Sequence, residues 1–567
     1  MRSFKTERAK LIRFFLTHSP GVILLAMLAS LIAGVGGAYL MTLINIRLSH
    51  GLTAASTLLP LVIAVTAVVL LSTIVAGLLA NYLAHNVCFD LRMYICRHML
   101  AAPLRHIEEF GDDRLLAALT QDVSNVVNAY FRLPLLFSNV AIIAGCVFFL
   151  GKLSLVLFAA LLAVIVVSVV SYLLVQRKAN RYFALGREEY GVSIKNFRGL
   201  HDGAKELRLN KARREQFFEM LLQPTALSER LYNIRGGNIF ALLNGSSQVL
   251  YFVAIVLFLF ILPGLVPIEL PVLIGYALIV LYMSGPMQGI VNSVPVYVSA
   301  GISLRKIEEL GLTFSPARVN TNPVAVPEIK RDWKRIDLIG VTHRYERERD
   351  SATFTLGPIN LSLYAGELVF VVGGNGGGKT TFAKLLSGLY TPDSGQIRLD
   401  NQPVTDQNRD WYRQHFSAVY SEFYVFEQLF GIDDGHHVNT ATYLAELQLD
   451  AKVQIKNGKF STTNLSLGQR KRLALLVAYL EDRPFYIFDE WAADQDPHFK
   501  GVFYHQILPE LKARGKTVLI ITHDDRYFDL ADRLIKFESG SLVDQWAPRA
   551  TVANQSASAE FIDFKSH

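Results

Sequence analysis

Residues 373–380 have the composition and spacing of a loop that binds nucleotide phosphates. They read Gly-Gly-Asn-Gly-Gly-Gly-Lys-Thr, which fits G-x-x-x-x-G-K-[ST], between a predicted strand at 368–372 and a predicted helix. Glycines allow backbone N–H groups to surround phosphate oxygens. The predicted phosphate-binding residues are Gly373, Gly374, Asn375, Gly376, Gly377, Gly378, Lys379, Thr380 and Thr381. The Lys379 ammonium is expected to meet the β- and γ-phosphates, and the Thr380 hydroxyl to ligate Mg²⁺.

A pair of adjacent acids, Asp489 and Glu490, ends an apolar run at 485–488. The run predicts a buried strand. A carboxylate at the end of such a strand holds Mg²⁺ in phosphate-loop enzymes, so Asp489 is the second expected metal ligand. Glu490 would orient or deprotonate the attacking water. An acidic pair after a strand is common by itself, but its position about 110 residues after Lys379 favours this function.

A third segment, Leu465-Ser466-Leu467-Gly468-Gln469, lies between these two and begins a predicted helix with Ser466 as its N-cap. A phosphate loop, then LSxGQ, then a strand ending in Asp-Glu resembles the ATP-binding-cassette (ABC) transporters. In that family two cassettes enclose two ATP molecules with Mg²⁺. The resemblance implies that Ser466, Gly468 and Gln469 of one chain face the γ-phosphate held by the other. One cassette per chain therefore implies a dimer.

The resemblance extends to three further positions. Tyr345 matches the aromatic residue that stacks on adenine, although a core aromatic is the alternative interpretation. Asp496 matches the aspartate of the loop after the catalytic glutamate. His523 matches the histidine that senses the γ-phosphate, and it ends a predicted strand, where ligand sites of α/β domains lie. Together with Glu490 it is the expected catalytic pair.

One segment departs from the family pattern. The stretch Ala-Val-Tyr-Ser-Glu at 418–422 places Ser421 where the family has a glutamine, with Glu422 next to it. A serine side chain is shorter and does not reach Mg²⁺ or the attacking water in the same way. Either Glu422 takes the place of the glutamine, or the coupling between cassette and membrane domain differs. The helical lobe at 427–464 is also expected to be shortened.

The N-terminal half of the chain contains apolar stretches that predict a membrane domain. Hydrophobic residues form 51% of the 567 residues, and the mean hydropathy is +0.29. The stretches long enough to cross a bilayer are 21–46, 55–84, 134–150, 153–174, 238–261 and 271–294. The first is interpreted as a retained signal anchor. The third and fourth are expected to meet at Gly151-Lys152. Polar residues such as Tyr276 and Ser293 either line a path or bond neighbouring helices.

The charge distribution predicts the orientation of these spans. The formal net charge is +7, and Lys and Arg are concentrated at 176–236, whereas the turn at 262–270 contains neither. The positive-inside rule places the N-terminus, 87–131, 176–236 and everything after residue 300 in the cytoplasm. It also accounts for the basic residues without nucleic-acid binding. The three cysteines form no CxxC pair, so neither a disulfide framework nor a zinc site is expected.

These observations predict an all-α membrane domain with six helices, of the type I ABC exporter kind, fused to an α/β P-loop nucleotide-binding domain. The expected divisions are a membrane domain at 1–312, a linker at 313–332, an ATP-binding domain at 333–547 and a polar tail at 548–567. Helical apolar spacing in the cytoplasmic loops predicts that the membrane helices continue outside the bilayer. In the first loop, Asp122-Val123 resembles a pair often found near the turn that couples membrane helices to the cassette.

Four stretches, 203–219, 418–431, 465–500 and 521–533, are similar to the bacterial cyclic-peptide and siderophore exporter group, which includes pyoverdine- and syringomycin-type secretion proteins. The resemblance covers nearly the whole chain. It implies a homodimer in the inner membrane of a Gram-negative bacterium that exports a nonribosomal peptide or siderophore precursor. It leaves open whether periplasmic or outer-membrane partners continue the route. Because the first span begins near residue 21, no N-terminal peptidase domain is expected.

Three other functions compete with this interpretation. A lipid or lipid A-type flippase has a similar architecture and would respond to lipid instead of peptide. A membrane sensor or scaffold would move no cargo, and it would tolerate the loss of a motif that is intact in this chain. An ATPase that handles nucleic acid would need one membrane anchor, which leaves the other predicted spans unexplained.

Overall fold

The computed structural model describes residues 20–50, 55–264, 268–309, 329–345, 354–432 and 440–547. The chain forms two compact units. The first combines residues 1–100 with 111–314, and the second combines 101–110 with 315–567. Most of the expected linker and the whole of the expected C-terminal tail lie outside the described residues. Each unit has its own hydrophobic core.

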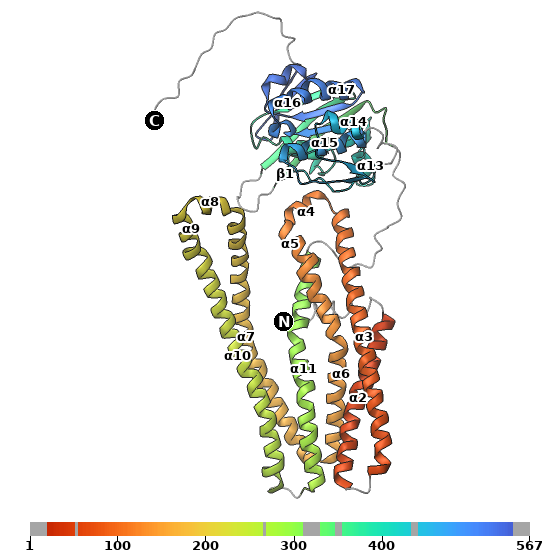
Figure 1. Ribbon diagram of the computed structural model, residues 1–567, viewed down its shortest axis with the longest axis vertical. Helices are drawn as coiled ribbons and strands as arrows, with labels where there is room; N and C mark the ends of the chain where they lie inside the picture. The colour runs from red at the N-terminus through yellow and green to blue at the C-terminus, as the bar shows by residue number, and fades with distance from the viewer. Residues whose placement is uncertain are drawn as a thin grey trace, which may run out of the picture. The chain divides into compact units, whose positions relative to one another are not determined.

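Six long helices form the first unit in the described residues (Figure 1). They are α2 (Pro20–His50), α3 (Ala55–Ala101), α6 (Val123–Leu153), α7 (Leu155–Asp202), α10 (Gln223–Val256) and α11 (Leu270–Glu309). In the part of the chain that the structure describes, four helices are long and apolar enough to cross a membrane, at Pro20–Leu48, Leu58–Ala101, Arg114–Leu153 and Leu270–Glu309. Shorter apolar helical segments lie at Leu157–Val167 and Phe252–Gly264. A helix satisfies its backbone hydrogen bonds internally, so apolar stretches of this length cross a bilayer as helices.

The boundary between the third and fourth long helices lies later than the sequence predicted. Gly151 and Lys152 are inside α6, which ends at Leu153. The break is at Ser154, whose backbone is extended at φ −162° and ψ 123° and whose hydroxyl accepts a hydrogen bond from the Leu157 N–H. An N-cap serine therefore ends one helix and starts the next. The prediction at Gly151-Lys152 was wrong because it followed hydropathy and not the capping residue.

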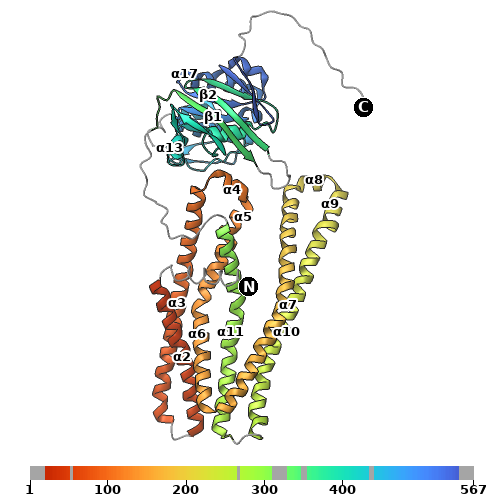
Figure 2. The same ribbon diagram turned by 180° about the vertical axis from the view of Figure 1, so that it is seen from behind.

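The helices α7 and α10 lie side by side along most of their length (Figures 1 and 2). α7 has 48 residues, and at ~1.5 Å per residue such a helix is about 72 Å long, against ~30 Å for the hydrocarbon core of a bilayer. Two short helices, α8 (Ala204–Leu209) and α9 (Lys211–Phe217), lie at the end of this hairpin. The hairpin therefore extends well beyond a bilayer, in agreement with the helical spacing of 176–236.

Polar side chains of α11 bond helix backbones. The Tyr276 side chain is fully buried, and its hydroxyl donates hydrogen bonds to the carbonyl oxygens of Leu150 (2.6 Å) and Ser154 (2.8 Å). The Ser293 hydroxyl donates to the Gly289 carbonyl at 2.7 Å. Of the two alternatives left open by the sequence, the structure favours hydrogen bonding to helices over lining a path for both residues.

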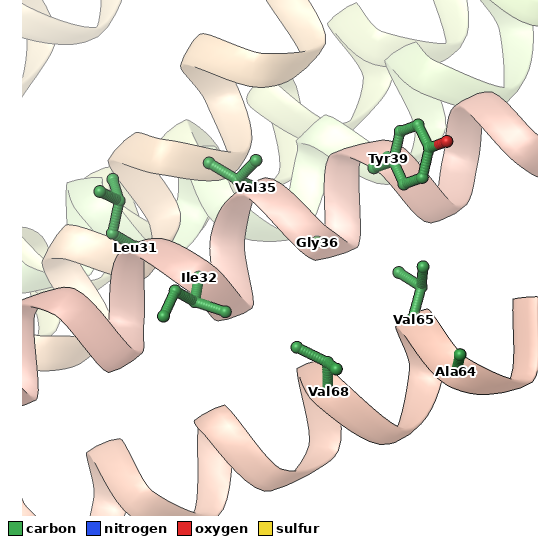
Figure 3. A pocket seen from close by; sticks show the side chains of 8 residues that line it. All are labelled: Leu31, Ile32, Val35, Gly36, Tyr39, Ala64, Val65 and Val68. Carbon is green, nitrogen blue, oxygen red and sulfur yellow. The ribbon is translucent and has the colours of Figure 1, made fainter. Parts of the chain in front are cut away.

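A pocket of about 470 Å³ opens between α2 and α3 (Figure 3). Its lining comes from both helices and consists of Leu31, Ile32, Val35, Gly36, Tyr39, Ala64, Val65 and Val68. Apart from the Tyr39 hydroxyl, no side chain in this lining can form a hydrogen bond. The pocket therefore offers hydrocarbon contacts almost exclusively.

The second unit is built on two sheets. The larger has the strand order β12-β11-β3-β10-β9-β6 and the smaller β2-β1-β4-β5. The strands of the larger sheet are β3 (Leu368–Val372), β6 (Phe416–Val419), β9 (Phe485–Asp489), β10 (Thr517–Ile521), β11 (Arg533–Glu538) and β12 (Ser541–Trp546). Those of the smaller sheet are β1 (Arg335–Tyr345), β2 (Phe354–Tyr364), β4 (Ser394–Leu399) and β5 (Gln402–Pro403). The strands β11, β3, β10, β9 and β6 are parallel, and every residue of β3, β9 and β10 is buried, as expected for a sheet covered on both faces.

Helices and the smaller sheet cover the larger sheet. The helices are α12 (Lys379–Leu386), α13 (Arg409–Arg413), α14 (Thr440–Glu446), α15 (Leu467–Glu481), α16 (Pro497–Val502) and α17 (Leu508–Ala513). One core cluster joins α12 to the smaller sheet, and another joins α15, α16 and α17 to the strands. Between 427 and 464, α14 is the one helix in the described residues, alongside the two-residue strands β7 (Ile455–Lys456) and β8 (Lys459–Phe460).

The short helix α4 (Leu104–Phe110) follows α3 in the chain but belongs to the second unit. The Glu108 carboxylate accepts hydrogen bonds from Lys384 Nζ at 2.7 Å and from the Tyr390 hydroxyl. Arg105 donates to Asp393 at 3.3 Å, and Leu104 packs against the core beside α12. Within the first loop, α4 is therefore the turn that contacts the nucleotide-binding fold.

Asp122, by contrast, lies inside the bundle of long helices. It is buried at the end of a π-helical turn (Ala118–Asp122), and its carboxylate accepts a hydrogen bond from the Ser303 hydroxyl at 2.7 Å. Asn125 donates to the same hydroxyl at 3.0 Å. This carboxylate joins the turn before α6 to α11, and the expectation that Asp122-Val123 is near the coupling turn stays a prediction.

Close packing of α2 on α6 generates a stability prediction. A methyl group at Gly34 would be 2.6 Å from the Ser138 carbonyl oxygen and 2.6 Å from Ala141 Cβ. Gly34→Ala must therefore separate the two helices, which costs about 1–3 kcal/mol, and the melting temperature of the purified protein in detergent should fall. The matched control is Gly77→Ala in α3, where a methyl group would meet nothing within 4 Å. Equal melting temperatures of the two variants would contradict this packing.

Candidate functional site

The parallel strands bring the sequence-predicted residues to one edge of the larger sheet. Ile521, the last residue of β10, is paired with Asp489 on one side and with Val371 on the other. The chain continues from β3 into 373–380, from β10 to His523 and from β6 to Ser421. Because parallel strands end at the same edge, four segments that are far apart in the sequence meet at one place.

Glycine is required at two positions of the loop 373–380. Gly373 has φ 139°, and a Cβ there would lie 2.0 Å from the Phe537 carbonyl oxygen. Gly378 has φ 95° and is the N-cap of α12. Positive φ is costly for side chains other than glycine. The loop therefore keeps its backbone N–H groups accessible at the start of a helix, an arrangement suited to binding anions.

Lys379 is held within this loop. Its ammonium donates hydrogen bonds to the carbonyl oxygens of Gly373 and Gly374, each at 2.9 Å, and the residue is buried. Burial lowers the Lys379 pKa, and the nearby carboxylates of Glu490 and Asp489 oppose that shift. A buried ammonium with two acids nearby is placed to meet the negative charge of a phosphate.

Asp489 is the buried acid of the site and has an exposed fraction of 0%. Its Oδ2 accepts hydrogen bonds from the hydroxyls of Thr380 (2.9 Å) and Ser421 (3.3 Å). Its Oδ1 is buried and has no hydrogen-bond partner among the residues that the structure describes. Burial raises the Asp489 pKa, the Thr380 bond opposes this, and the charge of Glu490 adds to it. A buried, ionised carboxylate with an oxygen that lacks a partner is stabilised by a cation beside it.

These residues fit Mg²⁺. The ion prefers oxygen ligands and is usually held by one or two protein oxygens together with substrate phosphates. Asp489 supplies a buried oxygen with no partner, and the Thr380 hydroxyl lies beside it. Among the described residues, no group of three or more His, Cys, Asp or Glu side chains could hold a metal alone. Asp489 and Thr380 would therefore hold Mg²⁺ jointly with the phosphates of a nucleotide.

Glu490 and His523 approach each other next to Asp489. Their side chains lie 3.3 Å apart, between Glu490 Oε1 and His523 Nε2, with 40% and 45% of the side-chain surface exposed. Glu490 has φ 49°, a conformation that is strained for a non-glycine residue and is often found at functional sites. The structure thus brings the two expected catalytic side chains together, and both are partly exposed.

The segment 465–469 is not joined to the loop 373–380 by any hydrogen bond or ion pair between described residues. Ser466 is the N-cap of α15 and forms a capping box with Gln469. A Cβ at Gly468 would lie 2.8 Å from the Asp494 carbonyl oxygen, and the Gly468 carbonyl accepts a hydrogen bond from Gln495 at 3.0 Å. Within one chain these residues therefore pack on the segment after Glu490, and their contact with a phosphate stays a prediction.

Asp496 and Tyr345 are the two remaining residues of the predicted site. Asp496 caps α16 by accepting a hydrogen bond from the Phe499 N–H at 2.9 Å, and it pairs with Arg472 at 2.6 Å. These bonds lower its pKa. Tyr345 is the last residue of β1, and its stacking on adenine stays a prediction. The position of Asp496 is therefore explained by contacts within its own chain, without a bound nucleotide.

Sequence reasoning missed three polar residues next to this site. Lys471 and Arg472 are buried in the first turns of α15, and Gln495 is buried after Glu490. Gln495 connects Arg472 to the segment 465–469, because its side chain accepts from Arg472 at 2.9 Å and donates to Gly468. The available signal was the run of three basic residues at 470–472, which precedes the apolar part of the helix, since basic residues are seldom buried without partners.

Comparison with known proteins agrees with this geometry. Residues 356–493 match the model of the ABC transporter family, and residues 21–198 match the ABC transporter transmembrane region. The ATP-binding protein SyrD of Pseudomonas syringae pv. syringae is 36% identical over 95% of this chain and 97% of its own length. A toxin RTX-I translocation ATP-binding protein of Actinobacillus pleuropneumoniae is 24% identical over 88% of this chain and 71% of its own.

A lipid flippase and a solved exporter structure are also similar to this chain. An ATP-dependent lipid A-core flippase of Alkalilimnicola ehrlichii is 31% identical over 37% of this chain and 37% of its own. A solved bacterial Atm1-family ABC exporter with ATP bound has a TM-score of 0.72 at 16% identity, covering 96% of this chain and 99% of that one. A helical membrane region fused to one such ATPase domain defines a half-size ATP-driven exporter. This chain belongs to the ABC transporter family, and its ATPase activity is coupled to transport.

The contact between Ser421 and Asp489 generates a pH prediction. The Ser421 hydroxyl helps to lower an Asp489 pKa that burial raises, so Ser421→Ala should raise this pKa further. Since Mg²⁺ binds the ionised carboxylate, the variant should lose ATPase activity at a higher pH than the parent protein as the pH falls. Its apparent Mg²⁺ affinity should weaken by about threefold to tenfold. Both are measured by titrating ATPase activity with pH and with Mg²⁺.

Glu422→Gln is the matched control, because the Glu422 side chain is exposed. It should leave both titrations unchanged. A loss of Mg²⁺ affinity in Glu422→Gln but not in Ser421→Ala would show that the glutamate, and not the serine, takes the place of the family's glutamine.

Proposed function

We propose that this chain is one half of a homodimer that exports a nonribosomal or cyclic peptide, or a siderophore precursor. The observation that carries the proposal is the match to SyrD, which extends over 97% of that relative and therefore includes the membrane helices as well as the ATPase domain. The four stretches that resemble the cyclic-peptide exporter group support the same cargo class. We place the protein in a bacterial inner membrane, with the N-terminus and the ATP-binding domain in the cytoplasm, from the distribution of Lys and Arg.

In the proposed mechanism ATP is bound by one chain and enclosed by the other. Lys379 contacts the β- and γ-phosphates, and Thr380 and Asp489 would hold Mg²⁺, which would neutralise part of their charge. Ser466 and Gly468 of the partner chain approach the γ-phosphate through the N-terminus of α15. Binding of ATP thus favours the closed dimer, because its phosphates gain these contacts only when the cassettes meet.

Hydrolysis then reopens the dimer. Glu490 accepts a proton from a water molecule as the water oxygen bonds to the γ-phosphorus, and the bond from that phosphorus to the oxygen of the leaving ADP breaks. His523, 3.3 Å from Glu490, is placed to contact the γ-phosphate and to orient the glutamate. Separation of the phosphate from ADP removes the link between the two chains. The cassettes part and the cycle restarts.

A lipid flippase is the second candidate function. A lipid A-core flippase matches 37% of this chain, and the pocket between α2 and α3 offers hydrocarbon contacts (Figure 3). The match covers much less of the chain than the match to SyrD, so peptide export is the better-supported proposal. A sensor or scaffold without cargo has less support, since the residues expected to hydrolyse ATP meet at one edge of the sheet.

The proposal is tested by the ATPase activity of the purified protein in lipid nanodiscs. Cyclic lipopeptides and siderophore precursors are added one class at a time, and one of these classes should stimulate hydrolysis. Glu490→Gln is the blank: its turnover should fall by about 10²–10⁴-fold because the general base is lost, and it should accumulate as an ATP-bound dimer. Stimulation by lipid alone would favour the flippase. Undiminished hydrolysis in Glu490→Gln would exclude the proposed role of that residue.

The ion pair between Glu108 and Lys384 generates a prediction about coupling. Glu108→Lys should place two ammonium groups together and reduce peptide-stimulated ATPase activity towards the unstimulated rate. Combining it with Lys384→Glu restores an opposite pair and should recover part of the stimulation, with a coupling free energy of about 1 kcal/mol. The measurement is the ratio of stimulated to unstimulated ATPase rates in the single and double variants. Purely additive effects of the two substitutions would show that this pair does not transmit the signal.

A further inference from the structure

A buried lysine connects the helix of the signature segment to the catalytic glutamate. Lys471 lies in the first turns of α15, two residues after Gln469, and only 2% of its surface is exposed. Its ammonium lies 2.7 Å from Asp494 Oδ2 and donates a hydrogen bond to the Glu490 backbone carbonyl at 2.8 Å. An ammonium this deeply buried is stable only with such partners. The lysine is therefore held in place by the segment that follows β9.

The main chain of Lys471 binds the same segment. Its carbonyl oxygen accepts a hydrogen bond from the indole N–H of Trp491 at 2.9 Å, and Trp491 is itself buried. One residue of α15 thus contacts Glu490, Trp491 and Asp494 through three separate interactions. A shift of α15 relative to β9 would therefore displace the peptide group that follows Glu490.

That peptide group carries strain. Glu490 has φ 49°, a conformation that costs about 1–3 kcal/mol for a non-glycine residue and persists only when its surroundings impose it. Three hydrogen bonds hold the backbone in this conformation: the Glu490 N–H donates to the Ile521 carbonyl at 3.0 Å, and the Glu490 carbonyl accepts from the Ala493 N–H at 3.2 Å and from Lys471 Nζ. The first bond joins Glu490 to β10, and the second belongs to the turn after Glu490. The third is the one that α15 supplies.

We propose that Lys471 is a positioning residue for the hydrolytic step: it fixes the Glu490 peptide, and so makes the direction of the Glu490 carboxylate depend on the position of α15. This inference rests on the proposed function, in which Glu490 activates water and the N-terminus of α15 contacts the nucleotide of the partner chain. Under that arrangement, closure on one nucleotide sets the position of α15, and Lys471 passes that position to the catalytic glutamate of the other site.

The test replaces Lys471 by Met, which keeps the length and apolar volume of the side chain and removes its donors. In nanodiscs, kcat for ATP should fall by about tenfold or more while KM changes by less than about threefold, because nucleotide binding uses other residues. The Hill coefficient for ATP should also fall towards one in this variant.

The matched control is Lys516→Met. Lys516 is also buried, pairs with Asp482 at 2.7 Å and donates to the Asp482 backbone carbonyl at 3.3 Å, but none of these groups is at the nucleotide site. It should lower the melting temperature about as much as Lys471→Met and leave kcat at the parent value. If both variants lose kcat in proportion to their melting temperatures, the role of Lys471 is structural and the proposal is overturned.

A second comparison separates the two partners of the ammonium. If Lys471 acts through the Glu490 carbonyl, then Lys471→Met combined with Asp494→Ala should stay as slow as Lys471→Met alone. Recovery of kcat in the double variant would mean that the lysine only neutralises Asp494, and would overturn the proposal. Glu490→Gln is measured in parallel. Undiminished activity in that variant would refute the role of Glu490 on which this inference rests, whereas an inactive Glu490→Gln with a fully active Lys471→Met would refute only the positioning role.

Discussion

Parallel hydrogen bonding between β3, β10 and β9 is the constraint on which the nucleotide site depends. It places Ile521 between Val371 and Asp489, so that the phosphate loop, the acidic pair and His523 all leave the sheet at one edge. The strands themselves are fully buried, and burial of Asp489 follows from its place at the end of β9. The same burial makes the unpartnered oxygen of this carboxylate a strong acceptor for a cation. The site therefore results from the topology of the sheet, and side chains refine it.

Local patterns made the ATP site and the long helices predictable from the sequence. The loop 373–380 depends on glycines that adopt positive φ, and the membrane helices depend on length and hydropathy. Each of these patterns can be recognised in a short stretch of sequence. The end of α6 was misplaced because one N-cap serine, Ser154, decides it. The contact of Asp122 with Ser303 was not predicted, because a resemblance between short segments does not specify a tertiary partner.

The residues that sequence reasoning missed share a physical reason. Lys471, Arg472 and Gln495 are polar groups with partners in distant parts of the chain, and no periodicity indicates those partners. In sequence, three basic residues near the start of a helix, at 470–472, are most simply interpreted as a solvated surface. Burial reverses that interpretation, since a buried charge without a partner would destabilise the fold by several kcal/mol. The segment 465–500 thus contains both the residues 465–469 that resemble the family pattern and the internal hydrogen bonds that hold their helix next to Glu490.

The helix α12 gives this site a direct link to α4. Its N-terminus is the end of the phosphate loop, with Thr380 bonded to Asp489. In its last turn Lys384 pairs with Glu108 of α4. A helix of eight residues is about 12 Å long, so Thr380 at its start and Lys384 in its last turn belong to one short element. Tyr420 adds a second connection, because its hydroxyl shares a hydrogen bond with Ser387 just after α12 and it precedes Ser421 in the chain. The bond between Tyr420 and Ser387 thus ties the segment after β6 to the helix that α4 contacts.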